Sequence, residues 1–159
     1  MMKLWMAPAG LHIEPGQVRD ARELARIHAT GFYRGWPEAE FASFLSERGT
    51  PTYVACDPKR KIAGFALIRI AADEAELLTI AVDPRWRGKR IGQALLRAAF
   101  DDLLMSPARR MFLEVSEGNA AAIRLYLGQG FKTISTRKGY YPKADGTAAT
   151  ALVMARDLG

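Results

Sequence analysis

The feature that most constrains the fold is an apolar stretch that leads directly into a basic turn and then into a helical pattern. The stretch ends in Ile80, Ala81 and Val82 and is nearly continuous in apolar residues, as is typical of a strand in the centre of a sheet. Residues 83–90 are polar, and Ile91–Met105 then carries apolar residues at helical spacing. This order of strand, turn and helix predicts a domain of mixed α and β structure.

The turn concentrates positive charge and small residues at the expected start of the helix. The residues concerned are Arg85, Arg87, Gly88, Lys89, Arg90, Ile91 and Gly92. Backbone N–H groups at the start of a helix lack partners within the helix, and together with the helix dipole they attract anions. Because glycine lets a phosphate approach the backbone closely, the turn predicts a site for a ligand that carries a pyrophosphate.

Two other interpretations of this turn stay open. A charged turn after a buried strand can be a solvated loop, and basic residues beside Trp86 can contact nucleic acid. The turn is not a P-loop, because no Gly-Lys-Ser/Thr follows, and it lacks the Gly-x-Gly-x-x-Gly pattern of dinucleotide-binding folds. The net charge of +6 is compatible with a nucleotide-like cofactor, a nucleic acid or an acidic lipid, and does not choose among them.

The rest of the chain predicts further helices and strands around this unit. Asp20 is expected to begin one helix through a capping box, Pro37 to open a second, and Asn119 to cap a third. Gly130 is expected to close the third helix in the left-handed conformation. Strands are predicted over residues 52–56, 61–70, 76–82, 110–115, 131–136 and 149–155.

Length and cysteine content limit the class of protein. A chain of 159 residues suits one domain, spanning residues 1–159. No apolar run approaches the roughly 20 residues of a membrane helix, and Pro8 and Gly10 interrupt the apolar start, so a cytoplasmic protein is expected. Cys56, the single cysteine, is interpreted as a buried structural thiol. No cluster of Cys and His has metal-ligand spacing, so no metal is expected.

The basic turn resembles motif A of the GNAT superfamily of acetyltransferases, whose pattern is Arg/Gln-x-x-Gly-x-Gly/Ala. Arg87 and Gly92 match the ends of the pattern, while Arg90 stands where the family usually has its middle glycine. The resemblance implies that the loop holds the pyrophosphate of acetyl-CoA. Because residues other than glycine rarely adopt a positive φ, Arg90 is expected in a helical conformation, with its side chain turned outward toward a CoA phosphate.

Motifs farther along the chain are similar to the RimI branch of this superfamily, the ribosomal-protein alanine N-acetyltransferases. They are Leu113-Glu114-Val115, Asn119-Ala120-Ala121-Ala122-Ile123, Leu125-Tyr126, Gly130-Phe131, Tyr140-Tyr141-Pro142 and Leu152-Val153-Met154. Thr150 departs from the branch, which usually has an acidic residue there, and Gln129 stands where the branch commonly has leucine. The resemblance implies the GNAT fold, a central, mostly antiparallel, splayed and twisted sheet flanked by helices.

The resemblance also implies roles for individual residues. Glu114 would be the general base that removes a proton from the substrate amine, and Tyr126 the general acid that serves the departing CoA thiolate. Asn119 would contact the pantetheine arm of acetyl-CoA. The backbone of the strand that ends in Ile80, Ala81 and Val82 would pair with the same arm.

Each of these side chains also has a purely structural interpretation. Glu114 can be a surface residue, since its neighbours in the strand are apolar and alternation puts it on the other face. Tyr126 can be an aromatic core residue, and Asn119 a plain helix cap. Tyr140 and Tyr141 would line a slot for a substrate N-terminus, with plain packing as the alternative.

The function that these expectations imply is transfer of an acetyl group from acetyl-CoA to the N-terminal α-amine of a protein. In the branch that the chain resembles, this is the N-terminal alanine of a small-subunit ribosomal protein. No cysteine lies near the motifs, so direct attack within a ternary complex is expected rather than an acetyl-enzyme. A lysine, a polyamine or another small amine stays open as the acceptor, and so does a non-catalytic basic module that binds RNA.

Overall fold

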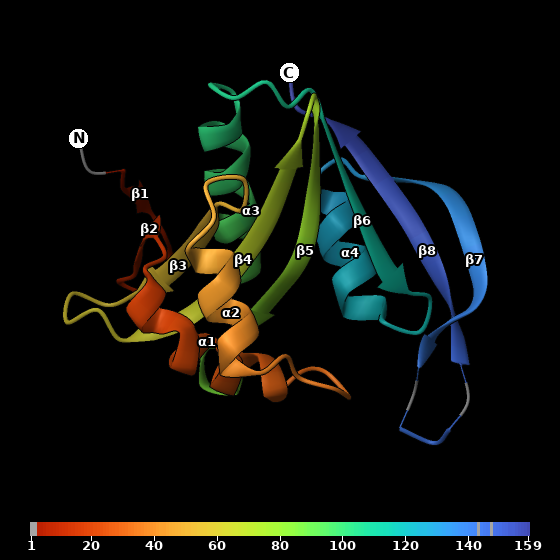
Figure 1. Cartoon of the computed structure of the whole chain (residues 1–159), viewed down its shortest axis with the longest axis horizontal. Helices are drawn as coiled ribbons and strands as arrows, with labels where there is room; N and C mark the ends of the chain where they lie inside the picture. The colour runs from red at the N-terminus through yellow and green to blue at the C-terminus, as the bar shows by residue number, and fades with distance from the viewer. Residues whose placement is uncertain (1–2, 143, 147) are drawn as a thin grey trace.

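The computed structural model describes residues 3–142, 144–146 and 148–159, and leaves the side chains of residues 140–142 outside the description. Within these ranges, eight strands form one sheet in the order β1-β2-β3-β4-β5-β6-β8-β7 (Figure 1). The strands are β1 (Trp5–Met6), β2 (His12–Pro15), β3 (Thr52–Cys56), β4 (Ile62–Ala71), β5 (Glu74–Val82), β6 (Arg110–Ser116), β7 (Lys132–Pro142) and β8 (Ala148–Asp157). The helices are α1 (Ala21–Ala29), α2 (Glu38–Leu45), α3 (Ile91–Leu103) and α4 (Ala120–Gly128), with two short 3₁₀ helices at Val18–Asp20 and Pro84–Trp86.

Helices cover both faces of the sheet, and each layer encloses its own apolar core. Helices α1 and α2 lie against one face (Figure 1), where Phe41 and Phe65 are fully buried. Helices α3 and α4 cover the opposite face, where Leu95, Leu113 and Phe131 belong to the larger core. Because side chains alternate between the two faces of a strand, one strand can supply residues to both cores. The mixed α/β class that the sequence predicts is confirmed.

The sheet opens between two of its central strands. Strand β5 pairs with β4 along its whole length, from Glu74 to Val82. With β6 it pairs in parallel only at Glu74–Glu76 against Arg110–Phe112, and Figure 1 shows the two strands separating beyond that point. The neighbouring strand pairs in the order of the sheet are antiparallel apart from this one. The mostly antiparallel, splayed sheet is therefore confirmed.

Most predicted elements lie at or near their expected positions. Strand β3 has the predicted bounds, and the side-chain oxygen of Asn119 caps α4 by accepting a hydrogen bond from the Ala122 N–H at 3.2 Å. Gly130 follows α4 with a φ of +91°, in the left-handed region as expected. Strands β7 and β8 are longer than predicted. The sequence gives no sign of β1 and β2, because these strands are too short for alternation to become visible.

The expected role of Asp20 as the capping residue of α1 is wrong, and Asp20 is instead the third residue of a capping box that begins at Gln17. Asp20 has a helical backbone, and its side chain makes no capping hydrogen bond to α1. Its carboxylate instead accepts a hydrogen bond from the backbone N–H of Gln17 at 2.8 Å and two from the guanidinium of Arg60, at 2.6 and 3.0 Å. The carboxylate thus joins the start of α1 to the turn between β3 and β4. No local sequence pattern predicts this tertiary contact.

Candidate active site

The opening between β5 and β6 leaves one edge of β5 without a neighbouring strand over the residues that the sequence singles out. Ile80, Ala81 and Val82 pair with β4 on one side only. Ile80 and Val82 are half-buried and pack against the core under α3 and α4, while Ala81 is buried on the opposite face. The side chains therefore fix the strand, and its backbone edge faces the opening. A free strand edge is a ready partner for an extended, amide-bearing ligand.

The basic turn leads from this strand edge to the start of α3. The Asp83 side chain accepts a hydrogen bond from the Arg85 N–H at 3.0 Å and begins the 3₁₀ helix Pro84–Trp86. Gly88 has a φ of +77°, and a Cβ atom built on it would meet nothing within 4 Å. Helix α3 then starts at Ile91. The backbone beside Gly88 is consequently open to solvent at the N-terminus of a helix of 13 residues, where an anion is stabilised.

Arg90 does not adopt the conformation expected of it. Its φ of +63° and ψ of +28° put it in the left-handed region, directly before α3. The expectation of a helical Arg90 is therefore wrong, because the turn needs a left-handed residue here and the chain meets that need without glycine. The conformation costs about 1 to 2 kcal/mol for a residue with a Cβ atom. Its side chain is exposed, as expected.

Gly92 has a packing role in addition to any role beside a phosphate. A Cβ atom at this position would lie 3.2 Å from Cδ2 of Leu125 on α4, which is tighter than ordinary contact. Ile91, just before it, is buried in the core. The small residue thus lets α3 approach α4 next to the opening of the sheet.

Two of the basic side chains hold the turn in place. Arg87 donates hydrogen bonds to the carbonyl oxygen of Val82 at 3.2 Å and to the hydroxyl of Thr30 at 3.4 Å. Arg85 donates to Asp83, which is 2% exposed and also accepts a hydrogen bond from Arg26 at 2.8 Å. Arg85, with Arg26 beside it, holds the pKa of Asp83 well below its usual range. Sequence reasoning missed Asp83, although an acidic residue before proline at the end of a strand is a recognisable turn signal.

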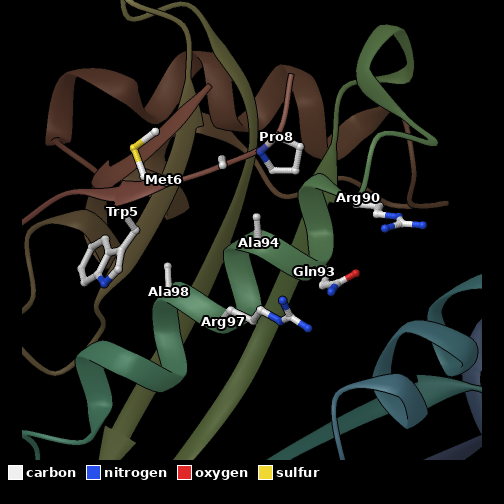
Figure 2. A pocket seen from close by; sticks show the side chains of 9 residues that line it. Trp5, Met6, Pro8, Arg90, Gln93, Ala94, Arg97 and Ala98 are labelled. Carbon is white, nitrogen blue, oxygen red and sulfur yellow. The ribbon is translucent and has the colours of Figure 1, made fainter. Parts of the chain in front are cut away.

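The other two basic side chains point to solvent. Lys89 and Arg90 are exposed, and within the part of the chain that the structure describes neither forms an ion pair. Arg90 borders a cavity of about 440 Å³ that runs along α3 toward the first strand. Figure 2 shows Arg90, Gln93 and Arg97 on one side of α3, with Trp5, Met6 and Pro8 across from the helix. The turn thus offers positive charge next to the start of α3.

Glu114 lies where the alternation in β6 predicts. Its neighbours Leu113 and Val115 are buried in the core under α3 and α4, so its carboxylate is on the other face of the sheet. The side chain is 27% exposed, and its Oε1 accepts a hydrogen bond from Nη1 of Arg137 on β7 at 2.7 Å. No local pattern points to Arg137, because it reaches Glu114 across the intervening strand β8.

Tyr126 lies on the opposite side of β6 from Glu114. It belongs to α4, is 6% exposed, and packs its ring edge to face against Phe131 at 5.8 Å between ring centroids. The ring is therefore part of the core, as its structural interpretation holds. Because the sheet is open beside β6, a ligand that occupies the opening has the face of Glu114 on one side and the layer of Tyr126 on the other.

The structure tests the remaining candidates only in part. Asn119 caps α4 as described, so its structural interpretation holds, and a contact with pantetheine stays a prediction. The backbones of Tyr140 and Tyr141 belong to β7, but their side chains lie outside the described residues. The slot that they were expected to line therefore also stays a prediction.

Comparison with known proteins assigns the chain to a family with this architecture. The model of the Acetyltransferase (GNAT) family matches residues 21–131. The chain is 37% identical over 148 residues to the [ribosomal protein bS18]-alanine N-acetyltransferase of Escherichia coli K12, which covers 93% of this chain and 88% of the relative. The chain belongs to the GNAT acetyltransferase family. The acetyltransferase therefore takes its acetyl group from acetyl-CoA, and the resemblance that motif A and the later motifs suggested is confirmed.

Solved structures agree with the fold of the acetyltransferase. The crystal structure of the ribosomal-protein-S18-alanine N-acetyltransferase from Escherichia coli superposes with a TM-score of 0.86 at 32% identity, covering 94% of each chain. Arabidopsis thaliana NAA60 in complex with acetyl-CoA has a TM-score of 0.81 at 20% identity, covering 92% of this chain and 98% of the other. The second likeness concerns the fold alone. No described helix is both long enough and apolar enough to cross a membrane.

The observed residues fit an acetyl-CoA molecule. The free edge of β5 suits the amides of the pantetheine arm, and the open backbone at Gly88 suits the pyrophosphate. Lys89 and Arg90 add exposed positive charge beside this turn, which would suit the phosphates of the nucleotide end. The edge of β5, the start of α3 and the exposed cations thus follow one another along the site. Pantetheine, pyrophosphate and nucleotide follow one another in the same order along acetyl-CoA.

Proposed function

We propose that this acetyltransferase modifies the N-terminal α-amine of a protein, and that its substrate is the N-terminal alanine of ribosomal protein bS18. The observation that carries the proposal is the likeness along nearly the whole chain to the Escherichia coli enzyme of that name, at 37% identity over 93% of the chain. The proposal treats residues 1–159 as one catalytic domain that acts in the cytoplasm, where ribosomal proteins are made.

The placement of Glu114 supports an amine as the acceptor. An ammonium group has no lone pair and cannot attack a thioester, so a proton must leave it first. A free α-amine has a pKa of about 7.7 to 8.0, and a carboxylate can accept its proton directly or through a water molecule. Glu114 already accepts a hydrogen bond from the cationic Arg137 at 2.7 Å. Arg137 therefore holds the carboxylate in a defined direction, from which it can accept the proton of the amine directly or through a water molecule.

Tyr126 would assist on the other side of the sheet opening. Acetyl-CoA supplies a thioester whose acetyl group passes to the amine while the thiol of CoA departs. A phenol, with a pKa of about 10, can donate a hydrogen bond or a proton to a departing thiolate. The buried ring of Tyr126, held by Phe131, keeps its hydroxyl in a defined direction.

The main alternative is acetylation of a lysine, a polyamine or another small amine. Fold alone allows all of these acceptors. A lysine amine has a pKa of about 10.4 and is almost wholly protonated at neutral pH, so it asks more of a general base than an α-amine does. A non-catalytic RNA-binding module is disfavoured, because a protein that only binds RNA has no use for the half-buried carboxylate of Glu114.

Two peptides test the acceptor. One begins with alanine and copies the N-terminus of the ribosomal substrate, and the other has a blocked α-amine and a free lysine. We expect one added acetyl group on the first peptide only, read by intact mass over time. Acetylation of the lysine peptide at an equal rate would overturn the proposal.

Two variants test the catalytic roles. Glu114→Gln and Tyr126→Phe should each slow acetyl transfer by about 10²-fold or more while acetyl-CoA still binds. Glu117→Gln, in the loop after β6, is the matched control and should keep the wild-type rate. Wild-type rates in both test variants would show that the roles are wrongly assigned.

A further inference from the structure

Three side chains with metal-binding atoms converge on the face of the sheet that carries α1 and α2, away from the opening between β5 and β6. They are His12 and Glu14 on β2 and Cys56 on β3. His12 and Glu14 are two residues apart and so point to the same face of their strand. His12 is the direct pairing partner of Cys56 in the neighbouring strand. The pairing of β2 with β3 therefore brings together donors that the sequence separates widely.

The geometry of this cluster is close to that of a zinc site. The ligand atoms all lie within 4.8 Å of one another. Nε2 of His12 is 3.4 Å from Sγ of Cys56 and 2.9 Å from Oε2 of Glu14. In tetrahedral zinc coordination, bond lengths of about 2.0 to 2.3 Å separate neighbouring ligand atoms by roughly 3.4 to 3.6 Å. Movements of up to about an ångström would complete three corners of the tetrahedron.

Hydrogen bonds alone cannot satisfy all three side chains of this cluster at once. Nε2 of His12 faces both Glu14 and Cys56, but one ring nitrogen either donates a single proton or accepts one. If it donates to Glu14, it cannot also accept from the thiol. A cation between the three atoms would interact favourably with all of them at once.

The charges around the cluster also suit a divalent cation. Glu14 and Asp20 each carry one negative charge, and both are bound to the single positive charge of Arg60, so this group has a net charge of minus one. Loss of the Cys56 proton would bring the net charge to minus two. Arg60 contacts Oε1 of Glu14 and leaves Oε2 directed at His12, which is how an outer partner orients a metal-binding carboxylate.

Access from solvent is available on one side of the cluster. The side chains of His12 and Glu14 are 23% and 14% exposed, while Cys56 is fully buried. A shift in the pairing of β3 with β4 between Ala55 and Cys56 marks a local irregularity beside the thiol, and such irregularities often redirect a side chain. An ion can therefore enter past His12 and Glu14 and reach the thiol from the outside.

We propose that His12, Glu14 and Cys56 form a zinc-binding site that joins β2 to β3. A set of one nitrogen, one oxygen and one sulfur donor suits Zn²⁺. On binding, a bond forms between sulfur and zinc, and the thiol proton leaves to the solvent. The site lies apart from the acetyl-transfer residues and adds stability to the strand pair, whatever the acceptor of the acetyl group proves to be.

The test is a titration of the metal-free full-length chain with Co²⁺, followed by absorbance. The chain has one cysteine and two histidines, so a sulfur-to-cobalt charge-transfer band can arise only from Cys56. We expect a 1:1 complex with this band, displaced by Zn²⁺. Cys56→Ser should abolish the band, and His12→Gln and Glu14→Gln should each weaken Co²⁺ binding by more than about tenfold.

Controls separate binding from folding. Glu38→Gln removes an exposed carboxylate on α2 and should leave the titration unchanged. Zn²⁺ should raise the melting temperature of the wild type and leave that of Cys56→Ala unchanged, which shows the effect even if a ligand variant is less stable. Absence of the band in the wild type, or equal Co²⁺ affinity in the wild type and His12→Gln, would overturn the proposal.

Discussion

Arg60 and Arg90 share the same positive φ in opposite settings. Both have a φ of +63°, which is unusual for a residue with a Cβ atom. The side chain of Arg60 is 20% exposed and binds the carboxylates of Asp20 and Glu14. Arg90 is exposed next to the start of α3 and forms no ion pair among the described residues. The same positive φ therefore goes with internal ion pairs in one turn and with an exposed side chain at the start of a helix in the other.

The contrast teaches that a positively charged side chain can be assigned to ligand binding only after its partners within the protein are known. Sequence reasoning gave weight to every basic residue between Arg85 and Arg90. In the structure Arg85 and Arg87 hold the turn together, while Lys89 and Arg90 are exposed and form no ion pair among the described residues. Arg60, outside this turn, forms ion pairs with Glu14 and Asp20 and serves the fold.

The largest expected effect comes from removing the paired arginine. Arg60→Met leaves the buried Asp20 and the half-buried Glu14 without their cation, and should lower the free energy of unfolding by about 3 kcal/mol. Urea unfolding at pH 7 measures the change. The KM for acetyl-CoA should stay within twofold of the wild-type value, because the guanidinium of Arg60 is held by Asp20 and Glu14, whereas that of Arg90 is exposed. A variant that is fully stable yet binds acetyl-CoA poorly would reverse the roles of the two arginines.

His28 extends the comparison to a buried side chain that is uncharged in the folded protein and is held by hydrogen bonds instead of ion pairs. It is 1% exposed, accepts a hydrogen bond from the Trp36 N–H at Nδ1, and therefore donates from Nε2 to the hydroxyl of Thr79 at 3.0 Å. Burial lowers the pKa of His28 from 6.5 to about 4. The unfolded chain thus binds a proton more readily, so stability is full above pH 6.5 and is lost as the pH falls toward 4.

The expected loss for His28 is about 2 kcal/mol between pH 7.5 and pH 5. Urea midpoints at the two pH values, with unchanged slopes, provide the measurement. His28→Gln should flatten the pH dependence, while His12→Gln, at the only other histidine, should retain it. If both variants show the same pH dependence as the wild type, carboxylates and not His28 control stability in this range.

The exposed arginine should matter for the cosubstrate and not for the fold. Arg90→Ala should raise the KM for acetyl-CoA by about tenfold, the equivalent of about 1.4 kcal/mol of a charge-assisted contact with phosphate. Arg48→Ala removes an exposed arginine in the connection between α2 and β3 and serves as the control. Steady-state kinetics with saturating peptide gives the values. An unchanged KM in Arg90→Ala would place the phosphates elsewhere along α3.

The same contrast separates the features that local sequence patterns could predict from those that they could not. Hydrophobic alternation put Glu114 on the correct face of β6, and the strand, turn and helix unit around Val82 was recognisable from pattern and composition alone. These features depend on neighbours within a few residues. The splayed sheet came from family resemblance, since no local pattern shows that β5 and β6 part after Glu76.

What the sequence did not predict depends on distant partners. Asp20 looked like a helix cap, but its carboxylate is bound by Arg60, 40 residues away. The pairing of Glu114 with Arg137 and the meeting of His12 with Cys56 follow from strand order and register. The left-handed Arg90 follows from the path of the turn, which overrides the preference of the residue.

The smallest expected effect is the most direct test of the backbone comparison. Arg90→Gly removes the strain of a Cβ atom at φ +63° and should raise the free energy of unfolding by about 0.5 kcal/mol, since glycine also has more freedom in the unfolded chain. Arg60→Gly relieves the same strain but loses the ion pairs, so it should destabilise the protein by about 2 kcal/mol. Urea unfolding of both variants under identical conditions gives two changes of opposite sign. Stabilisation of both variants would mean that backbone strain, and not the fate of the guanidinium, dominates in both turns. Destabilisation of both would mean that strain relief at Arg90 is smaller than the cost of the added freedom of glycine.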